Sequence, residues 1–329
     1  MRVLFIGGTG TISSACTQLA VERGIDLTLL NRRRSDRAVP AGAHVLHGNI
    51  RDPVSADQAL GDRTFDVVVN WVNYTPDQVE ADIERFQGRT GQYVFISSAS
   101  AYQKPLSGLP ITESTILDNP YWQYSRDKAA CEARLVRAYR EQGFPITIVR
   151  PSHTYDERML PVEGGYTVID RMRRGKPVIV HGDGTSLWVL THHRDLSVGF
   201  VGLLGNAHAI GEAYHITSDE LLTWNQIHEI LARAARTTAE IVHVPSDLIA
   251  AFDPRWGAGL LGDKAHSVIF DNDKIKRLVP DFRPTIPFSR GAEEILAWYD
   301  ADPARQAIDE AFDQLTDRII AASRSAYPV

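Results

Sequence analysis

A short apolar segment followed at once by glycines is the feature that most restricts how this chain can fold. Residues 2–6 (RVLFI) precede Gly7-Gly8-Thr9-Gly10, and residues 13–23 then have helical spacing. A strand, a glycine turn and a helix N-terminus in this order form a cradle for pyrophosphate, because glycine lets the backbone approach closely and the helix offers free N–H groups. The alternative is an ordinary strand–helix turn. We expect a dinucleotide here, with contacts from Gly7, Thr9, Gly10, Thr11 and Ile12.

The first half of the chain continues to alternate apolar segments with amphipathic ones. Segments that are apolar throughout are typical of strands buried on both faces, as in a parallel sheet covered by helices. The sequence therefore predicts an α/β fold with a doubly wound parallel (Rossmann) sheet. Strands are expected at 2–6, 26–30, 44–47, 65–70, 93–97 and 145–149, and helices at 13–23, 76–86 and 124–140.

The alternation loosens after Pro151, where glycine, proline and charge gather. We expect residues 1–151 to form the dinucleotide-binding domain, with added strands from the region near 187–217. Residues 152–329 are expected to form a smaller, mostly α/β substrate lobe across the carboxyl edge of the sheet, where ligands bind in such folds. Within this part, a strand is predicted at 213–217 and helices at 223–235 and 290–299.

Composition narrows the classes of function. The 329 residues carry a formal net charge of −6, which weighs against nucleic-acid binding because that needs a basic face. The two cysteines, Cys16 and Cys131, have no metal-ligand spacing, so no metal is expected, and so few cysteines favour a cytoplasmic location. No apolar run approaches the roughly 18 residues of a membrane span, and the N-terminus lacks a signal-peptide core.

The end of the second predicted strand bears on the choice of cofactor. An NAD site usually places a carboxylate there for the ribose hydroxyls, whereas this chain reads Asn31-Arg32-Arg33. Arginine pairs well with a 2′-phosphate, so the sequence favours NADP over NAD, with Asn31, Arg32 and Arg33 as contacts. A solvated surface run of arginines is the alternative.

A Tyr-x-x-x-Lys pattern lies on the helix predicted at 124–140. The four-residue spacing puts Tyr124 and Lys128 on one helical face. A nearby ammonium favours the phenolate, so we expect a lowered pKa for Tyr124 and a role as general acid and base. Ser98 ends the fifth strand at the same sheet edge and is expected to hydrogen-bond the reacting oxygen.

Four segments together resemble a known family over most of the chain. They are the glycine loop, ISSASAY at 96–102, YSRDK at 124–128 and VRPS at 149–152. The chain resembles the extended short-chain dehydrogenase/reductases, also called NAD-dependent epimerase/dehydratases. The resemblance implies catalysis by Ser98, Tyr124 and Lys128, and a homodimer formed by helices at 76–87 and 124–140. It also implies cofactor contacts at Asn49, Ile50, Trp71, Val72, Tyr124, Lys128, Pro151 and His153.

Departures from the family pattern narrow the substrate. Ala99 and Ser100 replace the Asp-Glu pair of the sugar 4,6-dehydratases, which argues against that chemistry. Trp188 and Leu260 stand where 4-epimerases carry two diphosphate-binding arginines, which argues against a standard nucleotide-sugar. Trp188 suggests stacking on a sugar ring or an apolar group. The expected substrate contacts are Ser98, Ala99, Tyr124, His153 and Trp188.

Three functions remain open from the sequence. The first is net hydride transfer between NAD(P) and a secondary alcohol or ketone carbon of a small sugar-like or polyol-derived substrate. The second uses the same residues for sugar or nucleotide-sugar epimerisation with recycled NAD. The third is a non-catalytic RNA-binding protein, because residues 262–282 also resemble a subgroup that includes the plant chloroplast stem-loop-binding proteins.

Overall fold

Seven parallel strands form the central sheet in a computed structural model, which describes residues 1–32 and 34–325. Their order is β3-β2-β1-β4-β5-β6-β11, and every neighbouring pair is parallel. The strand order reverses beside β1, as in a doubly wound sheet, so the predicted fold class is confirmed. The strands are β1 (Arg2–Ile6), β2 (Asp26–Asn31), β3 (His44–His47), β4 (Phe65–Asn70), β5 (Thr90–Ile96), β6 (Ile146–Pro151) and β11 (Ala213–Ile216).

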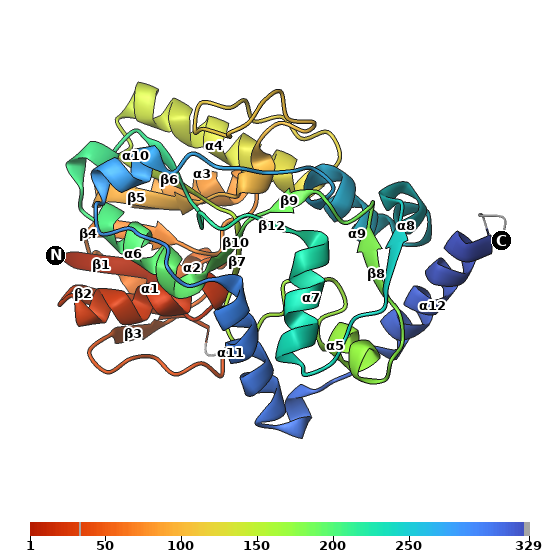
Figure 1. Ribbon diagram of the computed structural model, residues 1–329. Coiled ribbons are helices and arrows are strands. Elements are labelled where there is room, and N and C mark those ends of the chain that lie inside the picture. Colours follow the sequence, from red (N-terminus) through yellow and green to blue (C-terminus); the bar gives the residue numbers. More distant parts are fainter. Residues whose placement is uncertain (33, 326–329) are drawn as a thin grey trace.

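Helices cover both faces of this sheet (Figure 1). On one face, α1 and α6 pack over a core that includes Phe5 and Phe200, whose rings meet edge to face. On the other face, α3 and α4 pack over Tyr93 and Phe144. A short helix, α2, was not predicted; Asp52 caps its first turn. The bounds are α1 (Thr11–Glu22), α2 (Pro53–Leu60), α3 (Pro76–Phe86), α4 (Gln123–Gln142) and α6 (His193–Leu203).

The remaining strands form three separate pairs beside the sheet. Strand β11 joins the central sheet beside β6, as predicted. The two strands near residue 190, β9 and β10, do not join it, because they pair with β12 and β7. The described residues also form 3₁₀ turns at η1 (Ala99–Ala101), η2 (Ala207–Ala209) and η4 (Pro303–Arg305). The pairs are β7 (His153–Tyr155) with β10 (Leu190–His192), β9 (Leu187–Trp188) with β12 (Leu222–Thr223), and β8 (Val178–His181) with β13 (Ile241–Val244).

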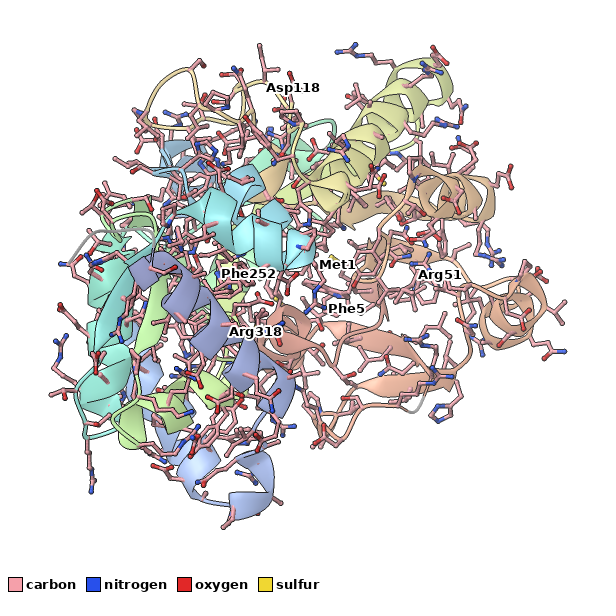
Figure 2. The ribbon with its side chains drawn as sticks, turned by 90° about the vertical axis from the view of Figure 1, so that its right-hand side faces the viewer. Met1, Phe5, Arg51, Asp118, Phe252 and Arg318 are labelled. Carbon is pink, nitrogen blue, oxygen red and sulfur yellow. The ribbon has the colours of Figure 1, made fainter. Side chains whose placement is uncertain are left out.

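A helical lobe packs beside the carboxyl edge of the sheet around its own apolar core. Figure 2 labels Arg318 on α12 and Phe252 on α8, two helices that contact each other through a smaller cluster at the end of the lobe. Within the part of the chain described, no helix is long and apolar enough to cross a membrane. Helix α10 (Asp273–Leu278) packs on the sheet against α6 and β11. The lobe helices are α5 (Tyr166–Arg173), α7 (Trp224–Ala234), α8 (Ser246–Phe252), α9 (Pro254–Gly259), the π-helical turn η3 (Leu260–Lys264), α11 (Phe288–Asp300) and α12 (Glu310–Ser325).

Candidate active site

The glycine loop between β1 and α1 has a backbone that other residues could not adopt without strain. Gly7 and Gly8 have φ angles of +98° and +111°. A Cβ on Gly8 would lie 2.9 Å from a methyl carbon of Leu29. The turn therefore needs glycine, and its backbone leads directly into the N-terminus of α1 at Gly10. This arrangement fits a pyrophosphate.

A groove of about 960 Å³ runs from this loop along the carboxyl edge of the sheet. Its volume is at the upper end of small-molecule pockets, which span roughly 300–1,000 Å³. Arg33 lies outside the described residues. The predicted cofactor contacts that line the groove are Gly7, Thr9, Gly10, Thr11, Ile12, Asn31, Arg32, Asn49, Ile50, Trp71 and Val72.

Arg51 is a groove residue that the sequence analysis missed. Its guanidinium donates to Asn73 Oδ1 at 2.8 Å and to the carbonyl oxygen of Val72. Burial lowers its pKa, and nearby acidic groups, first among them Asp82, oppose that shift. Arg51 thus fixes the turn after β4 that lines the groove. It carries no motif of its own, so only the folded contacts reveal it.

A second cavity, of about 430 Å³, adjoins the groove. The two share lining residues, among them Ile12 and Trp71, so they form one continuous site. Ser98, Tyr124 and Lys128 all line this second cavity, although they come from the end of β5 and from α4. The other predicted contacts that line it are Ala99, Pro151, His153 and Trp188.

Lys128 is held by two backbone oxygens at the floor of this cavity. Its Nζ donates to the carbonyl of Asn73 at 2.6 Å and to that of Ile96 at 2.7 Å. Burial lowers the pKa of Lys128 to about 8. The ammonium lies 5.8 Å from the centre of the Tyr124 ring.

The pKa of Tyr124 moves in the direction opposite to the one expected. Burial raises it to about 12, with the Ser98 side chain as the largest opposing influence. Lys128 does not lower the pKa of Tyr124 as expected, because its ammonium is directed to the carbonyls of Asn73 and Ile96. Burial of the phenol meanwhile disfavours its charged form. At neutral pH the Tyr124 phenol therefore carries its proton.

A chain of hydroxyl groups runs behind Ser98. Its Oγ lies 2.9 Å from Ser100 Oγ, which accepts a hydrogen bond of 2.8 Å from Ser125. The backbone N–H of Ser100 also donates to Ser98 Oγ. Ser100 and Ser125 are buried, and the sequence analysis assigned neither of them a role. Together they set the position of the Ser98 hydroxyl.

His153 and Trp188 meet on the far wall of the cavity. Trp188 Nε1 donates to His153 Nδ1 at 3.2 Å, and burial lowers the pKa of His153 to about 3, so the imidazole is a neutral acceptor. Trp188 is only 3% exposed and packs on Trp224 with ring centres 5.3 Å apart. It therefore lines the cavity but offers little surface for stacking on a sugar.

Asp263 and Lys264 complete the wall opposite the sheet. Both belong to η3, a π-helical turn, and such turns are frequent at functional sites. Asp263 lies 3.4 Å from the ammonium of the buried Lys104. Neither charged side chain was assigned a role from the sequence.

These features define a Rossmann-fold protein with a dinucleotide-type groove that opens into a Ser–Tyr–Lys cavity. A sequence model of the NAD-dependent epimerase/dehydratase family matches residues 3–217, and the chain belongs to that family of NAD(P)-dependent enzymes.

Two curated relatives and one solved structure illustrate the likeness. The chloroplast stem-loop binding protein of 41 kDa b from Arabidopsis thaliana is 28% identical over 257 residues, which cover 74% of this chain but only 65% of that protein. The 2′-dehydrokanamycin reductase of Streptomyces kanamyceticus is 23% identical over 310 residues, covering 91% and 84%. The UDP-glucose 4-epimerase of Thermotoga maritima, solved with UDP-glucose, has a TM-score of 0.74 at 20% identity over 92% of this chain and 99% of that one, a likeness of fold.

Proposed function

We propose that this protein transfers hydride between NAD(P) and a secondary alcohol or ketone carbon of a small sugar-like or polyol-derived substrate. The observation that carries the proposal is the continuity of the glycine-loop groove with the cavity lined by Ser98, Tyr124 and Lys128. The groove fits a dinucleotide, and the cavity offers a proton donor beside it. The activities of relatives, a reductase and an epimerase among them, support the same class of chemistry.

In the proposed mechanism each side chain has one task. A nicotinamide dinucleotide, when bound, supplies or accepts the hydride. Tyr124 Oη gives a proton to the carbonyl oxygen in reduction and takes one from the hydroxyl in oxidation. Ser98 Oγ, set by its hydroxyl chain, hydrogen-bonds the reacting oxygen. Lys128 keeps an ammonium 5.8 Å from the centre of the Tyr124 ring, near the charge that develops on the phenol as its proton leaves, although burial still raises the resting pKa of Tyr124.

We propose NADP as the favoured cofactor, with NAD as the alternative. Arg32 is exposed and lines the groove beyond β2, where a 2′-phosphate would lie. Arg34 lines the same groove and was not among the predicted contacts. Several proteins of similar fold were solved in complex with NAD, including the UDP-glucose 4-epimerase of Thermus thermophilus. The cofactor preference also bears on the choice between net reduction and epimerisation, since an epimerase recycles its NAD whereas a net reductase releases a changed cofactor.

The wider assignments are proposals as well. We propose a homodimer through α3 and α4. We also propose a dinucleotide domain of residues 1–151, which β11 joins, and a substrate lobe from residue 152 onward. A cytoplasmic location is proposed because the two cysteines are free, buried thiols. RNA binding draws support from the likeness to the Arabidopsis stem-loop binding protein. The set of Ser98, Tyr124 and Lys128 in one cavity favours the enzyme instead.

Removal of the Tyr124 hydroxyl tests the proposal. The cofactor-loaded protein would be incubated with a panel of sugars, polyols and their ketones, and absorbance of the reduced nicotinamide would be followed. Tyr124→Phe should lower turnover at least about a hundredfold and leave the cofactor Kd unchanged. Tyr121→Phe is the matched control, because Tyr121 is 46% exposed and does not line the cavity. Equal turnover by the two variants would refute the assignment.

A further inference from the structure

We propose that Lys264 is a specificity-determining residue that binds an anionic group, a carboxylate or a phosphate, on the substrate. The inference rests on the proposed function, because it assigns a substrate class to the same cavity. Lys264 lines the cavity with Ser98, Tyr124 and Lys128 but lies on η3, in the lobe rather than the sheet.

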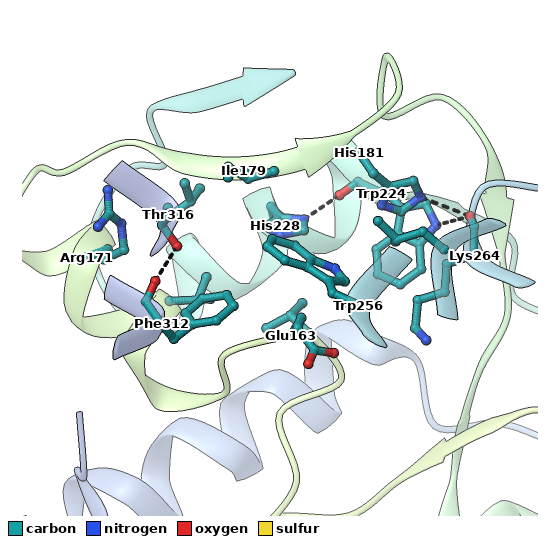
Figure 3. Close-up of a pocket in the computed structure, with 14 residues that line it drawn as sticks. Glu163, Arg171, Ile179, His181, Trp224, His228, Trp256, Lys264, Phe312 and Thr316 are labelled. Carbon is teal, nitrogen blue, oxygen red and sulfur yellow. Dashed lines mark hydrogen bonds between the residues drawn. The ribbon is translucent and has the colours of Figure 1, made fainter. Parts of the chain in front are cut away.

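The backbone of Lys264 is fixed by an unusual concentration of hydrogen bonds. Its carbonyl oxygen accepts from Trp224 Nε1 at 3.1 Å, from His181 Nε2 at 2.9 Å and from Ser186 Oγ at 3.3 Å. Figure 3 shows the first two of these bonds converging on Lys264. A backbone held at three donors presents its side chain from a defined point, which lowers the entropy lost when the ammonium binds a ligand.

The Lys264 ammonium lies close to the reacting groups. Its Nζ is 5.5 Å from the ring centre of Trp122, and that ring is 5.0 Å from the ring of Tyr124. Nζ therefore lies no more than 10.5 Å from the Tyr124 ring centre. Its charge also reaches His153 across the cavity, where it helps keep the imidazole neutral by lowering its pKa. These distances let an anion at Lys264 and a reacting carbon at Tyr124 belong to one small molecule.

The charge of the cavity favours an anion. Among the residues described, three charged side chains line it: Lys128, Asp263 and Lys264. Asp263 forms its ion pair with the buried Lys104, and Lys128 gives its hydrogen bonds to two carbonyls. Lys264 faces the Trp122 ring instead of a carboxylate. The positive charge still available to a ligand is therefore that of Lys264, and an anionic oxygen is its natural partner.

A smaller cavity on the other side of Lys264 does not suit the same ligand. Figure 3 shows this space, which Lys264 lines together with Trp224, Trp256 and His228. It measures about 40 Å³, which leaves room for a few waters, since one water needs about 10–15 Å³. The cavity of about 430 Å³ beside Tyr124 can hold a sugar acid or sugar phosphate, so the anion is assigned there.

Calorimetric titration of the cofactor-loaded protein tests the assignment. The probes are glucose, glucuronate, glucose 6-phosphate and UDP, so that neutral sugar, carboxylate, phosphate monoester and diphosphate are compared. At least one charged probe should bind about tenfold to a hundredfold more tightly than glucose. Lys264→Met should abolish that preference, and Lys264→Arg should retain it. Lys276→Met, which removes a surface lysine paired with Asp219, should behave as wild type.

Two results would overturn the proposal: wild-type protein that binds charged and neutral probes equally, or Lys264→Met that keeps the preference. Affinity for NAD and NADP, measured on the same samples, should be unchanged in Lys264→Met and in Lys264→Arg. A wild-type protein that binds neither cofactor would overturn the proposed function, while probe binding would still decide the role of Lys264. The probe that binds most tightly identifies the source of the anion.

Discussion

Replacing Asp82 by alanine should destabilise the protein by about 3 kcal/mol. One oxygen of this buried carboxylate, Oδ2, accepts from Asn70 Nδ2 at 2.6 Å, Asn73 Nδ2 at 2.7 Å and Tyr93 Oη at 2.5 Å. Asn73 keeps a 3.0 Å contact with Tyr93 after the change, so two buried donors lose their acceptor. Each buried donor without an acceptor costs about 1–3 kcal/mol of unfolding free energy. Part of this loss is offset because the variant no longer has to bury a carboxylate.

The same change should also reach the active site. The carbonyl of Asn73 accepts a hydrogen bond from Lys128, so a loosened Asn73 should lower kcat more than it alters cofactor affinity. Tyr93→Phe is the matched control, because it removes one donor and leaves the carboxylate bound to both asparagines. That variant should lose about 1 kcal/mol and keep its activity.

Urea unfolding followed by tryptophan fluorescence gives both free energies of unfolding. A loss of about 3 kcal/mol is easily measured, since domains of this kind are stable by only about 5–15 kcal/mol. If Asp82→Ala lost no more than Tyr93→Phe, the three hydrogen bonds would not stabilise the fold as argued. If it lost stability and kept full activity, the link through Asn73 to Lys128 would be wrong.

Three other outcomes are expected. Acid should destabilise the protein between about pH 6.5 and 4, because burial lowers the pKa of His181 and His228 to about 4 and the unfolded chain therefore binds more protons in this range. Each histidine should cost on the order of 2 kcal/mol of unfolding free energy at pH 5, and a pH dependence of stability unchanged in His228→Gln would contradict this. Ketone reduction should decline as pH rises through about 8, where Lys128 loses its proton, and a rate that stays level well above that pH would count against its role. Arg32→Ser should weaken NADP binding about tenfold and spare NAD, whereas equal changes in the two Kd values would exclude a 2′-phosphate contact.

Much of the fold follows from local patterns in the sequence. The apolar strands and the glycines between β1 and α1 predict the sheet because each signal lies within a few residues. The prediction at 76–86 agrees with α3 at both ends, and Thr223, the first residue of the helix predicted at 223–235, is the N-cap of α7 and accepts from Gln226 N–H. The short helix α2 was missed because its eight residues carry a weak apolar pattern, with two of them buried.

The parts of the site that sequence could not predict depend on distant contacts. Lys264 and Asp263 reach the cavity through η3, which contacts α8 and α9 and accepts a hydrogen bond at its Gly262 carbonyl from Asn119, more than a hundred residues away in the sequence. Arg51 acts through the turn after β4, and no local pattern indicates that contact. The raised pKa of Tyr124 reflects its burial, which a spacing of four residues along a helix does not reveal.

Titration of the purified protein with NAD and NADP, followed by intrinsic fluorescence, tests the central claim most directly. Trp71 lines both the groove and the cavity, so binding of either cofactor should change its emission. We expect saturable binding of both cofactors, with the tighter binding for NADP. The Gly8→Val variant should lose this binding, because its side chain would fill the space beside Leu29. NAD that stays bound through purification would favour epimerisation over net reduction. Binding of neither cofactor by the folded protein would contradict the account.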